Sequence, residues 1–493
     1  MSRARPGVAT HYLRYTAGNV LVMLAGFVSY PVMARLLDYT ELGIFGYYDT
    51  WLLILAGVFK LGGQHAILRF YPHRGGPEEL ARFGANFVLL PLLCSIGFWI
   101  LSLEVFGIYA VIHPLSRVAI GWLVLATLLP TIWISFVSGV FSAEERSDLN
   151  VRVNVSWKWL EVLAILPIIY FLARNAEGVY VGRLIAAALV AVVLIAWLWR
   201  RLPMHWRDRD VAAWWEGVRY GVPMMANELS AVLLSFVDRL MLRHMLGAFA
   251  PVGIYTIGYG LAMTINSLIQ NALYVSFVQV SVRQFETEGP EAVVRTKHAV
   301  LHVLVYVIVA AIVGLIVVGD DALVFLAGNA KVASAPVFVL IGINYLLNGM
   351  LSICSAGLML HKRSGVIFAT TCAATVLNVI LNLFWIPAYG VMGAVWATLV
   401  SFLVLNVARY VLCPRDLRAL PDARATGLAV LLACIVVGIA HASGLFGASS
   451  HLVRLLLMTG LLLVFYAGPA LLLDAPLRRS MQEWWEHRRG ASA

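Results

Sequence analysis

Long apolar runs, separated by short polar or charged stretches, recur from one end of this 493-residue chain to the other. A helix of about 20 apolar residues is long enough to cross the hydrocarbon core of a membrane, and it satisfies its backbone amides internally. The runs predict fourteen membrane-spanning helices, which begin near residues 12, 41, 82, 117, 149, 177, 220, 251, 296, 332, 364, 391, 424 and 451. We therefore expect an all-α polytopic membrane protein.

The composition agrees with this pattern. Hydrophobic residues make up 61% of the chain and charged residues only 13%, with a mean hydropathy of +0.85. These values lie far outside the range of soluble domains, and no stretch is left over for one. The five cysteines are scattered and never form a C-x-x-C pair, which argues against a disulfide framework or a zinc site.

Basic residues alternate between the loops as the positive-inside rule requires. Most of the 36 Lys and Arg fall at the N-terminus, in every second loop and at the C-terminus. The other loops hold only Arg35, Arg117, Arg174, Arg183, Arg243, Lys331 and Arg454. This distribution predicts that both termini are cytoplasmic, and it accounts for the net charge of +10 without a nucleic-acid partner.

The two halves of the chain echo each other. The matching pairs are Arg14-Tyr15 and Arg219-Tyr220, Leu42-Gly43-Ile44-Phe45 and Val252-Gly253-Ile254-Tyr255, and Gly178-Val179 and Gly390-Val391, at offsets of 205, 210 and 212 residues. Such offsets indicate a duplicated six-helix unit with two further helices appended. Because both units start on the same side of the membrane, we expect parallel repeats that form two lobes around a central cavity.

This repeat sets the predicted domains. They are an N-lobe of six helices (1–201), a cytoplasmic amphipathic linker (202–219), a C-lobe of six helices (220–413), the last two helices (414–475) and a cytoplasmic amphipathic tail (476–493). In the linker and the tail, Trp residues stand beside Arg, as is typical of helices that lie in the membrane interface.

Three segments resemble a known family. ARLLDYTELGIFGYY (Ala34 to Tyr48), VDRLMLRHMLGAFAPVGIY (Val237 to Tyr255) and NVILNLFWIPAYGVMGAVWAT (Asn378 to Thr398) resemble the polysaccharide transporter family of the MOP flippase superfamily. This family includes the Wzx-type O-antigen flippases, and lipid II flippases and MATE drug exporters are its cousins. The resemblance covers nearly the whole chain and rests on the order and spacing of the segments.

The resemblance implies a transporter whose central cavity opens alternately to each side of a bacterial cytoplasmic (inner) membrane. In the polysaccharide members, the cargo is a short oligosaccharide on undecaprenyl diphosphate, which serves the synthesis of cell-surface polysaccharides such as lipopolysaccharide or exopolysaccharide. The expected partners are this lipid-linked glycan, membrane lipids, and polysaccharide polymerase or export proteins. We expect a monomer, no cofactor and no nucleic acid, and the sequence leaves open whether transport is coupled to H⁺ or Na⁺.

A diphosphate that leaves water needs cationic donors in the cavity. Lys60 and Lys158 are the two lysines inside predicted spans. Each is placed roughly 14 Å from the cytoplasmic end of its helix, so the two match in depth and are expected to bind one headgroup. The alternative is structural: Lys158 pairs with Glu161 one turn away, and Lys60 extends toward the interface.

The apolar run from Tyr220 to Leu246 carries charges of its own. Charges inside such a run need a cavity or partners. Glu228 is a candidate proton or cation site that couples transport, or else a lone structural carboxylate. Asp238 and Arg239 point about 100° apart, so each needs its own partner. We expect them to act in gating or packing between the lobes, with direct ligand contact by Arg239 as the alternative.

Amides at helical spacing form polar stripes at Asn266 and Gln270, Asn344 and Asn348, and Asn378 and Asn382. We expect the first two pairs to line the cavity and bind sugar hydroxyls, with interhelical hydrogen bonding as the alternative. His298 and His302 are four residues apart but lack a third ligand, so no metal site is predicted.

No catalytic constellation stands out, and we expect no enzyme. Three functions remain open: a flippase for a lipid-linked oligosaccharide, a MATE-like cation-coupled drug antiporter, and a scramblase or structural membrane protein. A drug antiporter predicts an acidic cavity, so Lys60 and Lys158 favour an anionic cargo. Lipid II, the peptidoglycan precursor, is the nearest alternative cargo. Asn266 and Gln270 stand where a lipid II transporter is expected to carry an arginine, which favours other glycolipids.

Overall fold

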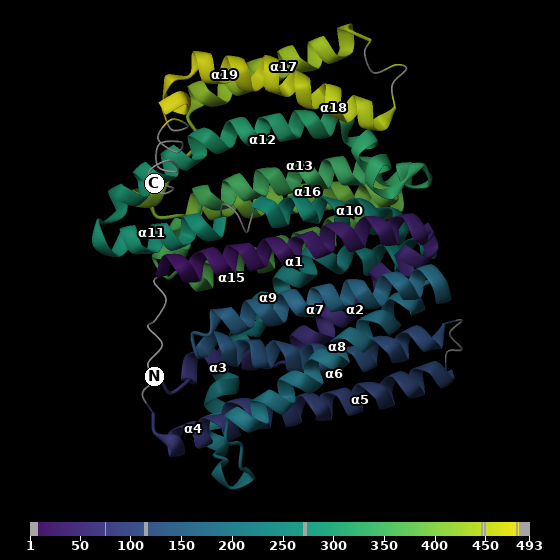
Figure 1. Cartoon of the computed structure of the whole chain (residues 1–493), viewed down its shortest axis with the longest axis vertical. Coiled ribbons are helices and arrows are strands. Elements are labelled where there is room, and N and C mark those ends of the chain that lie inside the picture. The colour runs from purple at the N-terminus through teal and green to yellow at the C-terminus, as the bar shows by residue number, and fades with distance from the viewer. Residues whose placement is uncertain are drawn as a thin grey trace. The chain divides into compact units, whose positions relative to one another are not determined.

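A computed structural model describes residues 8–73, 75–112, 117–269, 274–444, 447, 450–479 and 482. Side chains are described for these residues except at 8–17, 19, 147, 268, 269, 275 and 276. All regular structure in the described part of the chain is helical (Figure 1). The predicted all-α class is confirmed. The tail from 476 onward lies mostly outside the described residues.

The α-helices are α1 (Val8–Leu36), α2 (Tyr39–Phe59), α3 (Gly63–Phe70), α4 (Pro77–Phe83), α5 (Leu90–Ile112), α6 (Val118–Ala143), α7 (Ser147–Pro167), α8 (Ala176–Arg201), α9 (Val211–Leu246), α10 (Ala250–Ile269), α11 (Val275–Thr287), α12 (Pro290–Ala327), α13 (Ala335–Cys354), α14 (Gly357–Leu360), α15 (Ser364–Tyr389), α16 (Val391–Leu412), α17 (Ala423–Ala442), α18 (His451–Leu461) and α19 (Gly468–Leu473). Short π-helical segments are η1 (Gly84–Leu89), η2 (Ile168–Leu172) and η7 (Leu462–Ala467), and short 3-10 segments are η3 (Trp206–Asp208), η5 (Asn329–Ser334) and η6 (Arg415–Leu417).

Twelve helices in the described residues are long and apolar enough to cross a membrane, and they match twelve of the fourteen predicted runs. The other two predicted runs fall on α1 and α10, which are helical but are not among the twelve. The chain is therefore a multi-pass membrane protein, and the count of fourteen spans stays a prediction. The predicted start near 220 is too late, because Asp210 caps α9 and the helix begins at Val211. The last part of the predicted linker thus belongs to α9.

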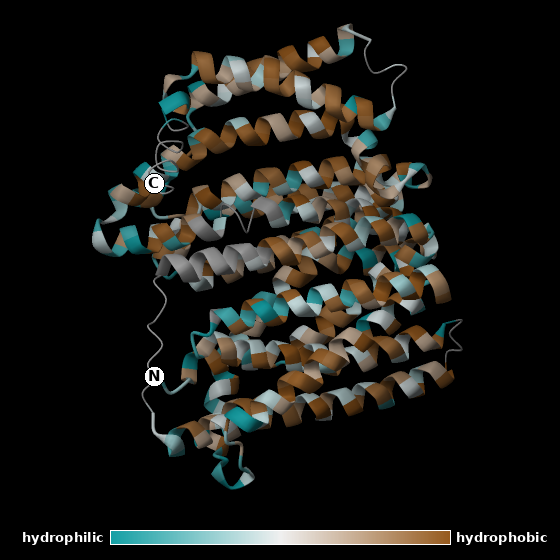
Figure 2. Ribbon diagram, in the orientation of Figure 1, coloured by the Kyte–Doolittle hydropathy of each residue, from teal (hydrophilic) through white to brown (hydrophobic). Residues whose placement is uncertain are grey.

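Large apolar side chains on the outer helix surfaces are exposed, as expected where hydrocarbon rather than water surrounds them. On α5, Val105, Ile108 and Val111 are 58%, 62% and 85% exposed. Hydrophobic colouring dominates α5 and α12 along most of their lengths (Figure 2).

The described residues form two compact units. The first comprises the chain up to Thr256 together with Val379–Val391, and the second comprises Ile257–Asn378 and the residues from Met392 onward. The domain boundaries predicted from the repeat, and the two six-helix lobes, stay predictions.

In the first unit, the two echoing glycine motifs meet. A Cβ atom on Gly43 would lie 1.9 Å from the Phe249 carbonyl oxygen, and one on Gly253 would lie 1.8 Å from that of Tyr39. The starts of α2 and α10 thus approach through reciprocal backbone contacts that only glycine permits. A two-fold relation between repeated units would produce this kind of contact.

The run predicted as one helix through Lys60 is broken. α2 ends at Phe59, and Leu61 and Gly62 adopt left-handed backbone conformations with φ of 47° and 69°. A Cβ atom on Gly62 would lie 2.0 Å from the carbonyl oxygen of Gly221 on α9, so the break is fixed by close backbone packing. The predicted depth of Lys60 assumed an unbroken helix, so it stays a prediction.

In the second unit, α17 and α18 pack along α12 (Figure 1). Asp474, just after α19, accepts hydrogen bonds from Tyr306 Oη at 2.7 Å and pairs with His302 Nε2 at 3.1 Å. Near the C-terminal end of α12, Asp321 pairs with His451 Nδ1 at 2.6 Å and Arg454 Nη1 at 3.1 Å. Polar pairs therefore fasten the last helices to α12 at two places along its length.

Candidate functional site

Four charged side chains of the first unit form a continuous network at mid-span. We call Asp49, Lys158, Glu161 and Arg183 the charged network; they come from α2, α7 and α8. Asp49 lies ten residues after the start of α2 and Lys158 eleven residues after the start of α7, which places both about 15 Å along their helices. Charges at that depth need partners, and the network supplies them.

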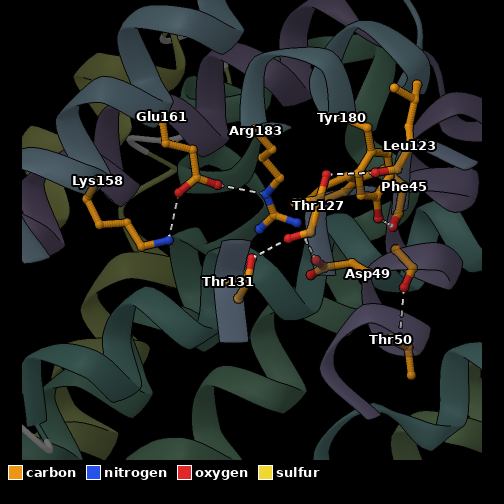
Figure 3. A network of polar contacts seen from close by, with 11 residues as sticks. Phe45, Asp49, Thr50, Leu123, Thr127, Thr131, Lys158, Glu161, Tyr180 and Arg183 are labelled. Carbon is orange, nitrogen blue, oxygen red and sulfur yellow. Dashed lines mark hydrogen bonds and ion pairs between the residues drawn. The ribbon is translucent and has the colours of Figure 1, made fainter. Parts of the chain in front are cut away.

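The network is a chain of ion pairs (Figure 3). Lys158 Nζ lies 2.8 Å from Glu161 Oε2, and Arg183 Nε lies 2.7 Å from Glu161 Oε1. Arg183 Nη1 also pairs with Asp49 Oδ1. The Arg183 guanidinium lies over the ring of Phe45, 5.3 Å from its centroid, so Arg183 is held on three sides.

A cavity of about 180 Å³ opens beside this network. It is lined by α1, α2, α7 and α8 residues that include Ser29, Tyr30, Lys158, Glu161 and Arg183. The Lys158 side chain is 39% exposed, against 10% for Glu161 and 20% for Arg183. The lysine is thus the cation of the network that is most open to an incoming anion.

A second polar cluster surrounds Lys60 at the break between α2 and α3. Lys60 Nζ lies 2.9 Å from Glu228 Oε1 on α9 and donates to Gln64 Oε1 at 3.2 Å. Gln64 Nε2 donates to Glu228 Oε2 at 2.7 Å, and His65 Nε2 lies 3.5 Å from the same oxygen. Ser135 completes the cluster by donating to Gln64 Oε1 at 2.6 Å. We call these five side chains the Lys60 cluster.

Two sequence interpretations change here. Lys60 does not extend alone toward the interface, and Glu228 is not a lone carboxylate, because the two form one ion pair. The two lysines also line different cavities: Lys158 the larger one, and Lys60 a cavity of only about 20 Å³. The Lys158–Glu161 pair that the sequence offered as an alternative is present. The proposed binding and coupling roles of these residues stay predictions.

Asp238 and Arg239 are buried side by side on α9. The Asp238 carboxylate accepts hydrogen bonds from Tyr255 Oη at 2.5 Å and Asn382 Nδ2 at 2.6 Å. The Arg239 guanidinium lies over Phe236 at 4.9 Å. Each residue therefore has its own surroundings, as the sequence predicts, and their gating role stays a prediction.

The amide stripes are only partly described. Asn344 is 6% exposed, and its side-chain nitrogen is buried without a hydrogen-bond partner among the described residues. The same holds for the side-chain oxygen of Asn266. Asn348 accepts a hydrogen bond from Asn406 Nδ2 at 3.0 Å, which is the interhelical alternative. Gln270 lies outside the described residues. Sugar binding by these amides stays a prediction.

No group of three metal-ligating side chains occurs in the described part of the chain. His302, which the sequence pairs with His298, instead contacts Asp474.

The sequence profile of the family described as "Polysaccharide biosynthesis protein" matches residues 10–278, more than half of the 493 residues. The chain belongs to this family. The match includes both the charged network and the Lys60 cluster. The family resemblance stated from the three sequence segments is confirmed.

One relative of this chain is the probable flippase AglR of Haloferax volcanii, which is 23% identical over 302 residues. The alignment covers 59% of this chain and 60% of the relative, so the chain spans about three fifths of that protein's length.

Two solved structures share the fold. The lipid II flippase MurJ, in an inward-closed conformation, has a TM-score of 0.68 at 14% identity and covers 92% of this chain and 97% of its own. A multidrug resistance MATE family transporter of the MOP superfamily, in an inward-facing conformation, has a TM-score of 0.61 at 15% identity and covers 80% of this chain and 93% of its own. At these identities the likeness shows the fold alone, which this chain shares with both transporters.

Sequence reasoning missed Asp49 and Arg183. Arg183 lies near the start of a predicted span and was counted as a loop residue, whereas α8 begins at Ala176 and places Arg183 about 10 Å inside the helix. Asp49, which follows Tyr48 and precedes Thr50, lies inside an apolar run. A carboxylate inside such a run requires a cation, so this residue was the available signal.

Proposed function

We propose that this protein is a flippase that moves an undecaprenyl-diphosphate-linked oligosaccharide from the cytoplasmic to the outer leaflet of a bacterial inner membrane by alternating access. The sugar and diphosphate headgroup crosses through the cavity while the lipid tail stays in the bilayer. Both termini are cytoplasmic, and H⁺ or Na⁺ drives the cycle through Glu228. Family membership, a MOP-superfamily fold and a relative named as a probable flippase support this assignment.

The observation that carries the proposal is the open cation at mid-span. Lys158 lines a cavity of about 180 Å³ and is the most exposed member of the charged network. An anion that enters an apolar environment without compensation faces a desolvation penalty of several kcal/mol. A cation exposed at that depth offsets part of this penalty, which suits a diphosphate and disfavours a cationic drug.

Lipid II is the second candidate cargo, because the fold likeness to the lipid II flippase MurJ extends over 92% of this chain. Both cargoes carry a diphosphate, so Lys158 serves either. A transport assay with each lipid separates them.

The test is polymer export from cells that produce the protein's variants, normalised to the amount of protein in the membrane. K158Q should lower export per molecule about tenfold or more, since a charge-assisted hydrogen bond is worth about 1.5–3 kcal/mol. K158R should retain most export because the charge and a phosphate-binding fork remain. R152Q is the matched control: Arg152 lies on the same helix, is exposed and lines a different cavity. Export by K158Q at the level of R152Q would contradict the proposed site.

A further inference from the structure

Glu161 has two cations, one on each carboxylate oxygen. Arg183 Nε lies 2.7 Å from Oε1, and Lys158 Nζ lies 2.8 Å from Oε2. If Lys158 moves away, the carboxylate therefore keeps a short, charge-assisted hydrogen bond. A buried carboxylate that retains a cation avoids most of the cost of an unpaired buried charge.

Arg183 cannot readily follow Lys158. It also pairs with Asp49 on α2 and lies over Phe45, so its guanidinium is fixed between three helices. The planar fork of an arginine loses little freedom per hydrogen bond, whereas a lysine is a point charge on a flexible stem. Lys158 is also about twice as exposed as Arg183, at 39% against 20%. The mobile partner of Glu161 is the lysine.

We propose that Glu161 is an internal counter-anion which holds Lys158 until a phosphate group takes its place, and that Arg183 is the positioning residue that makes this exchange possible. The proposal rests on the proposed function for the identity of the anion, a lipid-linked diphosphate. In the resting state the two carboxylates and two cations of the network balance. When phosphate arrives, Lys158 exchanges one anion for another and is not left unpaired in the cavity.

In the Lys60 cluster, the carboxylate has no second permanent cation to keep when its lysine moves away. Glu228 has one permanent cation, Lys60, because His65 is charged only when protonated. Removal of Lys60 would leave Glu228 with a hydrogen bond from Gln64 but no permanent cation. The same exchange would cost more there, so the structure assigns it to Lys158 alone.

The test measures binding of inorganic pyrophosphate and of farnesyl diphosphate to the purified full-length protein in nanodiscs. E161Q removes the competing charge but leaves an amide oxygen that accepts from Arg183, so both probes should bind about tenfold more tightly than to wild type. K158Q and the K158Q/E161Q double variant should show no such gain. A gain in affinity is not a result that misfolding produces.

E41Q is the matched control. Glu41 is also 10% exposed at its side chain and pairs with an arginine, Arg117, but it lies outside the cavity. Its substitution should leave pyrophosphate binding unchanged. If E161Q does not fold, R183K provides the opposite arm: Glu161 then relies more on Lys158, and both probes should bind several-fold more weakly than to wild type.

Equal or weaker binding of both probes to E161Q, or no binding to any variant, would overturn the exchange. These outcomes differ from a failure of the proposed function. Tighter binding to E161Q without movement of lipid-linked oligosaccharide by the wild type would retain the exchange and reject the flippase. Movement by the wild type with unchanged binding to E161Q would retain the flippase and reject the exchange.

Discussion

At the scale of single residues, sequence spacing predicts the ion pair between Lys158 and Glu161 but not the partner of Glu228. Lys158 and Glu161 are three residues apart on one helix, so their ion pair could be written down from the sequence. Glu228 and Lys60 are 168 residues apart, and nothing local joins them. Tertiary packing brings them together, and sequence reading therefore left each without the other.

The Lys60 cluster leads to a prediction about coupling. In E228Q, an amide replaces the carboxylate that holds Lys60, so the hydrogen bond from Lys60 can persist while the charge that would bind H⁺ or Na⁺ is lost. If Glu228 couples transport, the dependence of the transport rate on pH and on sodium concentration should disappear in this variant.

The measurement is transport by reconstituted protein across a series of pH values and sodium concentrations, with S135A as the control within the same cluster. Ser135 contacts Gln64 and carries no charge, so its loss should change the rate without flattening the ion dependence. Wild-type ion dependence in E228Q would remove Glu228 from the coupling mechanism.

At the scale of helices, the apolar runs predicted the positions of twelve candidate spans. The runs did not predict where the helices break or begin irregularly. The break at Leu61 and Gly62 lies inside a run whose hydropathy continues through it, and at the break Gly62 packs closely against the backbone of Gly221. α9 was predicted too short because the charged residues Glu216 and Arg219 interrupt its first turns, although Asp210 is a good N-cap.

The reciprocal glycine contact between α2 and α10 predicts a local packing defect. G43V would place side-chain atoms against the Phe249 carbonyl, where even a Cβ atom would lie 1.9 Å away. The two helices must then separate, at a cost of about 1–3 kcal/mol as for other overpacked sites.

Thermal unfolding in detergent measures this effect. G43V should lower Tm by several degrees, while G97A on α5 is the control because a Cβ atom there meets nothing within 4 Å. Equal Tm values for G43V and wild type would show that the helix starts can separate without loss.

The fastening of α12 to the last helices predicts a pH effect. Burial acts to raise the pKa of the Asp474 carboxyl, but hydrogen bonds from the Leu477 amide and from Tyr306 and His302 outweigh burial and hold this pKa below its usual value. A carboxyl whose pKa is lowered on folding stabilises the protein above its unfolded pKa of about 3.9, and this stabilisation is lost as the pH falls through the folded pKa.

D474N should therefore be less stable than wild type at pH 7, by about 1–3 kcal/mol for the loss of charge-assisted hydrogen bonds. The difference should shrink as the pH falls from about 4 toward 3, where the wild-type carboxyl also becomes neutral. Unfolding of the two proteins in detergent at each pH provides the comparison. A difference that stays constant down to pH 3 would mean that the charge of Asp474 contributes nothing.

At the scale of the whole molecule, composition and charge alternation gave the membrane class, and the order of three loose segments gave the family. The repeat predicted from the glycine motifs stays a prediction, although Gly43 and Gly253, which belong to matching motifs, lie in contact. The charged network could not be predicted as a whole, because its members come from three helices whose packing the sequence does not encode in any spacing. Asp49 was the signal in the sequence, because a carboxylate inside an apolar run requires a nearby cation.

We propose that this protein moves a lipid-linked oligosaccharide and uses Lys158 to do so. The most direct measurement reconstitutes purified protein into liposomes with an undecaprenyl-diphosphate-linked oligosaccharide in one leaflet and follows the appearance of its sugar on the other side. We expect saturable, protein-dependent movement that falls about tenfold or more in K158Q and is retained in R152Q. Movement no faster than in protein-free liposomes, equal movement of a phospholipid without sugar, or equal rates for K158Q and wild type would contradict the account.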